Sequence, residues 1–581
     1  MMAEGYDYDA VVIGSGFGGA VTGCRLAQAG YGVVILERGH RWGPRKGYRN
    51  EGSRTGDQPD ADVMAYPRTS RDPWLWDHEH PERTRGWVDF RQFPHMRVIQ
   101  GAGVGGGSLI YANVSIDANP ESFARGWPEQ ITFEKLAPYY ARVGEMLELG
   151  RVPERQRSER VSLMRDAAHA NGWGERFHAV DVAVRFDPEM TYDSSQRPDP
   201  AKFLRERNRH GAWQGSCAHL ANCDIGCDVG AKNTLDKNYL FVAERERAQI
   251  RPLHLVRSIE VFGAGYRVHF DRIVEDRFEP GSVTGRLVIV AAGSLGSTEL
   301  LLRCRDQYRT LPRLSRVLGQ GWSSNGDFLT PALHFGRPLL YPGRGITIAG
   351  SINFLDGRPD DPAPPQEKPK FLIEDGGFPY QVAGALIRHL AMNRGHDVRL
   401  RHRVLHLGLK IAARLYDFVH WVTRRSALRF LRPLFEHADP INHLMPWFAQ
   451  GQDKADGTLS IRHGELHLDW PYEHSKPVID AIYETHRRLA RSTGGWVLPP
   501  ITWTWFHSLI TPHPLGGCNM GTDAETGVVD HTGEVFEYRG LYVADGAIVP
   551  EALGLNPSKT IAALAERIAE HIIRDHPPGP R

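Results

Sequence analysis

Residues 9–38 read DAVVIGSGFGGAVTGCRLAQAGYGVVILER, and this stretch decides the fold. An apolar strand leads into Gly14, Gly16 and Gly19, a helix follows, and Gly30 separates that helix from a second apolar strand. In such a unit the first glycine permits a tight turn, the second lets the backbone approach a pyrophosphate, and the third lets the helix pack on the strand. The pyrophosphate then sits at the N–H groups of the helix N-terminus. The stretch therefore predicts a dinucleotide-binding βαβ unit.

Glu37 ends the second strand, 23 residues after Gly14, and indicates which dinucleotide is bound. A carboxylate there accepts hydrogen bonds from the adenosine ribose hydroxyls and would repel a 2'-phosphate. A GxGxxG pattern alone could be an ordinary glycine-rich turn. Here strand, glycines, helix, second strand and acid occur in the order that the dinucleotide motif requires, which favours binding.

Composition restricts the class of protein. A chain of 581 residues with 41% hydrophobic residues is too long for one simple core and predicts two domains or one large composite. The formal net charge of +1 gives no global field that would recruit nucleic acid, so no nucleic-acid partner is expected. Six cysteines in so long a chain are not a disulfide framework. With no signal-peptide pattern before the first strand and no apolar run long enough to span a bilayer, a cytoplasmic protein is expected.

A second glycine-rich segment, GAGVGGGSLIYANVS, occupies residues 101–115 and has five glycines in its first seven positions. Such a run brings backbone against something large and flat or adopts a series of positive φ angles. A flexible loop is the alternative, but the bulky residues on both sides suggest an ordered one. A nicotinamide cofactor needs no second glycine-rich binding segment, whereas a flavin has a ribityl chain and a ring system that such a segment can hold. The segment therefore favours FAD.

Two later segments return the chain to the same parallel sheet. Residues 286–304, RLVIVAAGSLGSTELLLRC, read as a buried strand, a glycine turn and a helix. The strand at 541–545, LYVAD, places Asp545 and Gly546 at its carboxyl end, where open α/β sheets bind ligands. The helix after Pro557 points its N-terminus at that edge, where its partial positive charge can stabilise the negative charge of a reduced flavin.

Cys217, Cys223 and Cys227 lie within eleven residues, CAHLANCDIGC. Clustered cysteines can ligate iron or zinc, but three with only His219 nearby match no standard zinc spacing. The alternatives are a metal or iron–sulfur site and three buried free thiols in a tight loop. No metal ligand is assigned here.

The segment 398–432 carries nine Arg or Lys residues and one acid, Asp417. Apolar residues recur at three- and four-residue steps, which predicts an amphipathic basic helix. One interpretation is a helix packed on the core. The other is peripheral contact with a membrane surface, because basic flanks with Phe and Trp are typical of such helices.

Taken together, the motifs resemble those of the glucose-methanol-choline (GMC) flavoprotein oxidoreductases, in particular the cholesterol-oxidase-like branch. The matching elements, in the family's order from residue 9 to residue 567, are IGSGFGGAV with Glu37, QGAGVGGGSL, GAKNTLDKNYL, AAGSLGS, HPLGG and VADGAIVPEALGLNPSKTIAALAER. The cysteine loop and the basic segment depart from the well-known cholesterol oxidases. The resemblance implies bound FAD, held by Gly14, Gly16, Phe17, Gly18, Gly19, Glu37, Gly101, Gly105, Gly106, Gly107, Ser108, Asn113, Val256, Ala292, Gly293, Asp545, Gly546, Asn556 and Pro557.

The resemblance also implies an α/β fold of two parts. The expected Rossmann-like FAD-binding domain, with a parallel sheet, combines residues 1–130, 230–320 and 505–581. The expected substrate-binding domain combines residues 131–229 and 321–504 and is built on an antiparallel sheet with helices.

The implied catalytic residues are His513, Asn556 and, as a base for moving a steroid double bond, Glu374. Imidazole suits removal of a hydroxyl proton, because its pKa lies near working pH. His513 and Asn556 also have structural alternatives: a buried His in a Pro-flanked turn and an Asn that initiates a helix.

The expected reaction is oxidation of the hydroxyl group of a hydrophobic alcohol to a carbonyl, with the hydride passing to flavin N5. Segments 371–391 and 501–510 are rich in apolar and aromatic residues, which favours a sterol, steroid or long-chain alcohol. Oxygen or another acceptor would reoxidise the flavin. The alternatives are a sugar-type FAD dehydrogenase with an iron–sulfur cluster at the cysteine loop and a membrane partner, and a nucleotide-binding protein without catalysis.

Overall fold

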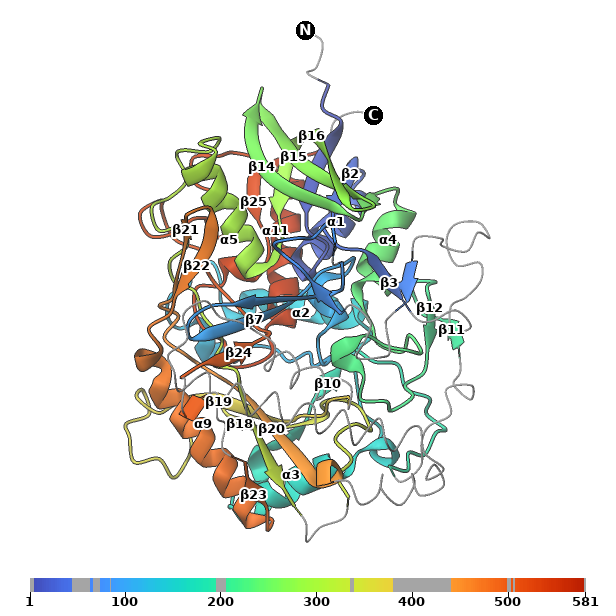
Figure 1. Ribbon diagram of the computed structural model, residues 1–581, viewed down its shortest axis with the longest axis vertical. Helices are drawn as coiled ribbons and strands as arrows, with labels where there is room; N and C mark the ends of the chain where they lie inside the picture. Colours follow the sequence, from blue (N-terminus) through green and yellow to red (C-terminus); the bar gives the residue numbers. More distant parts are fainter. Residues whose placement is uncertain are drawn as a thin grey trace.

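The computed structural model describes residues 5–43, 63–65, 74–83, 85–194, 205–334, 339–379, 440–498, 503–504 and 507–578. Two large sheets organise the molecule, and a smaller sheet lies between them in the view of Figure 1. The basic segment 398–432 lies outside the described residues, so neither interpretation of it is tested. No helix within the described ranges has both the length and the hydropathy needed to cross a bilayer.

The first sheet has seven strands and contains the predicted βαβ unit. Its order is β13 (Gln249–Arg251), β2 (Val33–Leu36), β1 (Tyr8–Ile13), β16 (Arg277–Val290), β15 (Gly265–Val274) and β14 (His254–Phe262), with β25 (Leu541–Val543) also paired to β16. The pairs β13–β2, β2–β1, β1–β16 and β16–β25 are parallel, whereas β14, β15 and β16 form an antiparallel meander. The parallel strands β1, β2 and β25 are mostly apolar and buried, as expected of a sheet covered on both faces.

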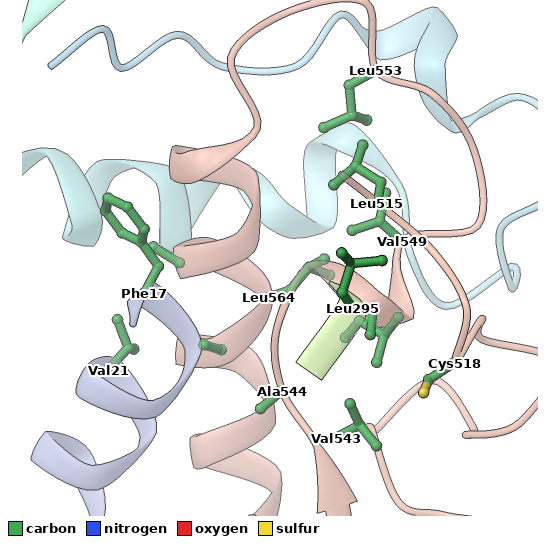
Figure 2. Packing of buried hydrophobic residues seen from close by; sticks show 14 of the residues in the cluster. Phe17, Val21, Leu295, Leu515, Cys518, Val543, Ala544, Val549, Leu553 and Leu564 are labelled. Atoms are coloured by element: carbon green, nitrogen blue, oxygen red, sulfur yellow. The ribbon is translucent and has the colours of Figure 1, made fainter. Parts of the chain in front are cut away.

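Helices pack against this sheet or against one another beside it, and they join distant segments of the chain. They are α1 (Phe17–Gln28), α2 (Phe133–Met146), α4 (Tyr239–Arg245), α5 (Gly293–Leu302) and α11 (Ser558–Asp575). Helix α11 contacts both α1 and α2, so the first and last parts of the chain share one core. Figure 2 shows Phe17 and Val21 of α1 beside α11, with Leu515, Leu295 and Val549 gathered nearby. Burial of each such side chain stabilises the fold by about 1.5–3 kcal/mol.

The second large sheet has six strands, all antiparallel, in agreement with the prediction. The order is β23 (Trp496–Val497), β17 (Phe328–Leu333), β20 (Leu444–Gly451), β19 (Phe371–Asp375), β18 (Gly350–Phe354) and β9 (Phe177–Ala179). Helices α9 (Tyr472–Ser492) and α3 (Glu159–Ala170) contact its strands. Phe328 of β17 stacks on His486 of α9, with 6.3 Å between ring centroids. Since side chains alternate along a strand, the residues next to Phe328 face the other way.

Register identifies that other face. Leu329 pairs with Phe448 of β20, Phe448 pairs with Glu374 of β19, and Glu374 pairs with Ser351 of β18. Directly opposite residues on neighbouring strands share a face of the sheet. Glu374 therefore lies on the face turned away from α9, in one row with the apolar Leu329 and Phe448.

The smaller sheet contains β24 (Leu509–Thr511), β7 (Met96–Gly101), β6 (Val88–Gln92) and β5 (Leu75–Trp76), with β24 parallel to β7. It joins the second glycine-rich segment, which follows β7, to the connection after β24 that carries His513. The remaining strands form four two-stranded ribbons: β3 (Arg41–Gly43) with β4 (Val63–Ala65), β8 (Gly150–Arg151) with β10 (Asp181–Val182), β11 (Arg205–Arg207) with β12 (Trp213–Gly215), and β21 (Thr458–Arg462) with β22 (Glu465–Asp469).

Candidate active site

The two glycine-rich segments lie in backbone contact. Gly106 has a φ of 50°, and a Cβ added to it would stand 2.6 Å from the Cα of Gly16. Ser15 links the same segments, because its Oγ accepts a hydrogen bond from the N–H of Gly105 at 3.1 Å and donates one to Glu37 at 2.6 Å. The segments predicted to hold the two ends of FAD thus form one continuous cradle.

Glu37 is buried at the end of β2, as the motif requires. Its carboxylate accepts hydrogen bonds from the N–H groups of Ser15 at 3.1 Å and Gly39 at 3.0 Å, besides the Ser15 hydroxyl. Burial raises the pKa of Glu37, and these hydrogen bonds act against that rise. The acid therefore fixes the turn around the cradle, in addition to the ribose contact that the sequence predicts.

Asp545 joins the two later motifs. Its Oδ2 accepts hydrogen bonds from the N–H of Gly293 at 2.8 Å and the Oγ of Ser297 at 2.5 Å, and its Oδ1 accepts from the N–H of Ala547 at 2.8 Å. Two further predicted cofactor residues lie at helix N-termini: Ala292 directly precedes helix α5, and Pro557 directly precedes helix α11. The carboxyl ends of β16 and β25 are thereby held together beside the cradle.

Several features of the cradle fit a flavin dinucleotide. Asn113 is fully buried with a φ of 71°, yet neither its Oδ1 nor its Nδ2 has a hydrogen-bond partner among the described residues. The buried hydroxyl of Ser115 likewise has no hydrogen-bond partner among the described residues. No side chain in the described ranges caps helix α1, which leaves its first N–H groups for a pyrophosphate. Beyond the Cα of Gly107 the space is open.

Two predicted cofactor residues have other contacts. Ser108 donates to the carbonyl of Gly105 at 2.7 Å and accepts from the N–H of Leu235 at 3.1 Å, so its hydroxyl braces the cradle. Val256 lies on β14, partly buried against the core, beside a bulge in its pairing with β15. Their roles in FAD binding stay predictions.

We expect Asn113→Leu to weaken FAD binding by a factor of about ten, because a good hydrogen bond to the cofactor contributes on the order of 1–1.5 kcal/mol. Leucine has nearly the volume of asparagine and keeps the site packed. Fluorescence titration of the apoprotein with FAD measures the dissociation constant. Asn119→Leu is a matched control, because Asn119 caps a short helix by accepting from the N–H of Glu121. Equal affinities for the wild type and the Asn113 variant would remove this residue from the FAD site.

His513 is held in one orientation by Asp327. The Nδ1 of His513 lies 2.8 Å from Oδ1 of Asp327, which is buried just before β17. The hydroxyl of Thr511 donates to the other oxygen of Asp327 at 2.6 Å and accepts from the N–H of His513 at 2.9 Å. A donating Nδ1–H leaves Nε2 as the proton acceptor. The imidazole is 16% exposed and lies 6.2 Å from the ring of Phe448.

Opposing effects of burial and of neighbouring acids act on the pKa of His513. Burial lowers the pKa of His513, but the charge and hydrogen bond of Asp327, with weaker contributions from Glu374 and Asp224, raise it above the usual value. Burial also raises the pKa of Asp327, although the neighbouring imidazole counteracts this. The site is therefore arranged to stabilise the positive charge that forms when His513 takes up a proton.

Glu374 and Asn556 meet in the same region. The Oε2 of Glu374 accepts hydrogen bonds from the Nε2 of Gln450 at 2.9 Å and the Nδ2 of Asn556 at 3.4 Å. The Oε1 of Glu374 and the Oδ1 of Asn556 are buried and have no partner among the described residues. Burial raises the pKa of Glu374 to about 7, so its carboxyl can exchange a proton near neutral pH.

Asn556 owes its position to the segment that also carries Asp327. The Nδ2 of Asn325 donates to the carbonyl of Leu555 at 2.8 Å, and its Oδ1 accepts from the N–H of Gly554 at 2.8 Å. The three predicted catalytic residues thus come from the connection after β24, from strand β19 and from the residues before α11, and the structure brings them together. Sequence reasoning missed Asp327, Gln450 and Asn325, for which no local motif gives a signal.

The cysteine loop gives no metal site in the described part of the chain. All six cysteines are free thiols there. The sulfur of Cys217 accepts from the N–H of His219 at 3.4 Å, and that of Cys227 accepts from the N–H of Ala231 at 3.2 Å. Within the described residues, no group of three or more His, Cys, Asp or Glu side chains is placed to hold a metal ion.

The geometry defines an oxidoreductase site between a dinucleotide cradle and an antiparallel sheet, and comparison with known proteins gives the family. The GMC oxidoreductase family model matches residues 505–565, and the NAD(P)-binding Rossmann-like domain model matches residues 12–59. A cholesterol oxidase of Mycobacterium tuberculosis is 30% identical over 97% of this chain and 90% of its own length. One from Acinetobacter baumannii is 28% identical over 99% of this chain and 96% of its own.

A solved structure shares the fold: pyridoxine 4-oxidase from Mesorbium loti superposes with a TM-score of 0.59 at 15% identity, covering 98% of this chain and 99% of the other. The chain belongs to the GMC oxidoreductase family, in its cholesterol-oxidase-like branch. It is an FAD-dependent enzyme that oxidises alcohols at the CH–OH group, as the sequence predicts.

Proposed function

We propose that the protein oxidises a hydrophobic alcohol, a sterol, steroid or long-chain alcohol, to the corresponding carbonyl compound. The observation that supports this proposal is the apolar surface beside the candidate catalytic residues. On the sheet face that carries Glu374, three successive pairs between β17 and β20 are apolar: Leu329 with Phe448, Pro331 with Pro446 and Leu333 with Leu444. Leu329 is 43% exposed, and Phe448, Leu333 and Leu444 are partly exposed. A sugar would leave its hydroxyl groups unpaired against such a surface.

In this proposal, Nε2 of His513 accepts the hydroxyl proton, and Asn556 binds the same oxygen and fixes the carbinol carbon. Bound FAD supplies the acceptor for the hydride that leaves that carbon. Asp327 holds the imidazole and stabilises the positive charge that His513 acquires. Oxygen is the proposed final acceptor, since the two curated relatives are named as oxidases; formation of hydrogen peroxide would test this.

Anaerobic bleaching of the flavin by sterols, long-chain alcohols and sugars tests the substrate class. We expect bleaching by the apolar alcohols, and a matched sugar panel at the same concentration serves as the control. Bleaching by sugars alone would contradict the proposal. The sugar-type alternative with an iron–sulfur cluster has no support from the described thiols, and an assay for iron and acid-labile sulfide would test it independently.

We also propose the two-part division of the chain, with an FAD-binding part of residues 1–130, 230–320 and 505–581 and a substrate-binding part of residues 131–229 and 321–504. The seven-stranded and six-stranded sheets support it. Helix α2 is an intermediate case, because it packs against α11 although its residues fall in the substrate-binding ranges.

Glu374 is proposed to move the double bond of a steroid product. At a pKa of about 7 its carboxyl can both accept and return a proton near neutral pH. We expect Glu374→Gln to stop isomerisation and to slow oxidation much less. Chromatography of the product would then show accumulation of the unconjugated ketone. A conjugated ketone formed at the wild-type rate would contradict this role. Gln450→Glu is unsuitable as a control, because it adds a second buried acid beside Glu374.

A peripheral membrane contact through residues 398–432 is proposed from the sequence alone, since the segment lies outside the described residues. A lipophilic substrate is concentrated in bilayers, and basic amphipathic helices bind anionic headgroups. We expect salt-sensitive co-sedimentation with anionic liposomes. Changing Arg424, Arg425 and Arg429 to Glu should reduce the bound fraction several-fold.

The control variant for this experiment carries the same change of charge elsewhere. Arg151, Arg165 and Arg574 have side chains that are 69%, 52% and 62% exposed, and their replacement by Glu should leave binding close to that of the wild type. Equal loss in both triple variants would indicate a nonspecific charge effect. Equal binding by the wild type and by the variant of Arg424, Arg425 and Arg429 would instead favour a helix packed on the core.

A further inference from the structure

Gln450 interrupts an apolar row on strand β20. On the sheet face that carries Glu374, the three preceding residues of this strand are apolar, namely Leu444, Pro446 and Phe448. Gln450 pairs with Leu372 of β19, so Glu374 is its diagonal neighbour, within reach of a long side chain. The side chain of Gln450 is fully buried. A buried amide in an apolar row requires a hydrogen-bonding partner, because burial of a polar group is otherwise unfavourable.

That partner is the carboxyl group of Glu374. The Nε2 of Gln450 donates to Oε2 of Glu374 at 2.9 Å, and the Nδ2 of Asn556 donates to the same oxygen at 3.4 Å. The other oxygen of Glu374, Oε1, is buried and accepts no hydrogen bond from the described residues. Two amide groups, one from β20 and one from the residues before α11, therefore act on one oxygen of the carboxyl group and not on the other.

The two oxygens of Glu374 consequently differ in chemistry. An oxygen that accepts two N–H groups is the carbonyl oxygen of a protonated carboxyl group, since an amide nitrogen donates a proton and does not accept one. The hydroxyl proton is thereby placed on Oε1. In the carboxylate form, the same donors stabilise the charge on Oε2, so Oε1 is the more basic oxygen.

We infer that Gln450 is a positioning residue that acts through Glu374 and makes Oε1 the atom that carries the proton while a steroid double bond moves. In that step Oε1 takes a proton from the carbon between the carbonyl group and the double bond. It then returns the proton to the far carbon of the double bond, so that the product is an isomer and no oxidant is used. The inference rests on the proposed role of Glu374.

The hydrogen bond from Gln450 also affects the pH at which Glu374 ionises. Burial raises the pKa of Glu374 to about 7, and the hydrogen bond from Gln450 opposes this rise most strongly. The charge of His513 and the hydrogen bond from Asn556 also lower this pKa, whereas the neighbouring Asp375 raises it. Without the Gln450 amide the carboxylate has one donor fewer, so the pKa of Glu374 should rise.

The carboxyl group of Glu374 can be observed without turnover. In the FAD-loaded enzyme, infrared spectra recorded against pH contain the C=O band of the protonated carboxyl group, which Glu374→Gln identifies by its absence. Methionine has nearly the shape of glutamine and no donor, so we expect Gln450→Met to raise the pKa of Glu374 by about half a unit or more. The band should also move to higher frequency, because the carbonyl oxygen then accepts one hydrogen bond fewer.

Isomerisation is measured separately from oxidation when an unconjugated steroid ketone is supplied as the substrate. We expect the acid limb of its pH profile to move to higher pH in Gln450→Met by the same amount as the infrared titration, because the carboxylate is the form that takes the proton. The value of kcat above that limb should fall several-fold, since the proton is no longer confined to Oε1.

Gln452→Met is the matched control. Gln452 follows β20 and donates to the hydroxyl of Ser122 at 3.3 Å instead of to Glu374, so its replacement should leave the band and the pH profile unchanged. If Gln450→Met fails to retain FAD, Gln450→Leu tests the same loss of the donor. An unchanged band and pKa of Glu374 in every Gln450 variant that lacks the donor and retains FAD would overturn the inference. A wild-type enzyme that leaves the unconjugated ketone unchanged would end the proposed role of Glu374 instead, and the infrared titration distinguishes the two failures.

Discussion

Replacing His513 with alanine should lower kcat by a factor of about 100 or more, the scale expected for loss of a positioned acid–base group, while FAD stays bound. The hydrogen bond between Asp327 and Nδ1 of His513 fixes the orientation of the imidazole, which serves as the base. Alanine leaves no acceptor for the hydroxyl proton. Rapid-reaction measurement of flavin reduction isolates the affected step, because it excludes reoxidation.

His507→Ala is the matched control for this variant. His507 lies just before β24, and its ring stacks on Tyr472 with 4.8 Å between centroids. We expect this control to keep turnover within about a factor of three, as is usual for a substitution away from reacting groups. Near-normal turnover of the His513 variant with a full complement of flavin would remove His513 from catalysis.

The cofactor half of the molecule could be predicted from sequence because its determinants are local. Gly14, Gly16 and Gly19 and the strands around them lie within 30 residues, and each glycine meets a geometric requirement of the same βαβ unit. The position of Glu374 in a strand was also predictable, since the three residues before it, FLI, are apolar, and β19 confirms the strand.

The hydrogen bonds that hold the candidate catalytic residues in place could not be predicted in the same way. Asp327 holds His513 across 186 residues, and Asn556 reaches Glu374 across 182. Neither Asp327 nor Glu374 stands in one of the matching motifs, and both pairings depend on how β17 and β19 align in the antiparallel sheet.

The second large effect is expected for Asp327→Asn, which keeps the shape of the side chain and removes its charge. Asp327 fixes the imidazole with Nδ1 as donor, so that Nε2 is free to accept a proton. An amide can instead donate to Nδ1, which places the proton on Nε2 and leaves no acceptor for the hydroxyl group. In a serine-protease triad the equivalent change lowers kcat by about 10⁴, and we expect a loss of about 10² or more here.

The double variant Asp327→Asn, His513→Ala shows whether Asp327 acts through the imidazole. If it does, the double variant should be no slower than His513→Ala alone, because the orienting carboxylate has nothing left to orient. Losses that multiply would mean that Asp327 acts independently, for instance by holding Thr511 and the connection after β24. Flavin content and thermal unfolding should be compared in all variants, since Asp327 is buried.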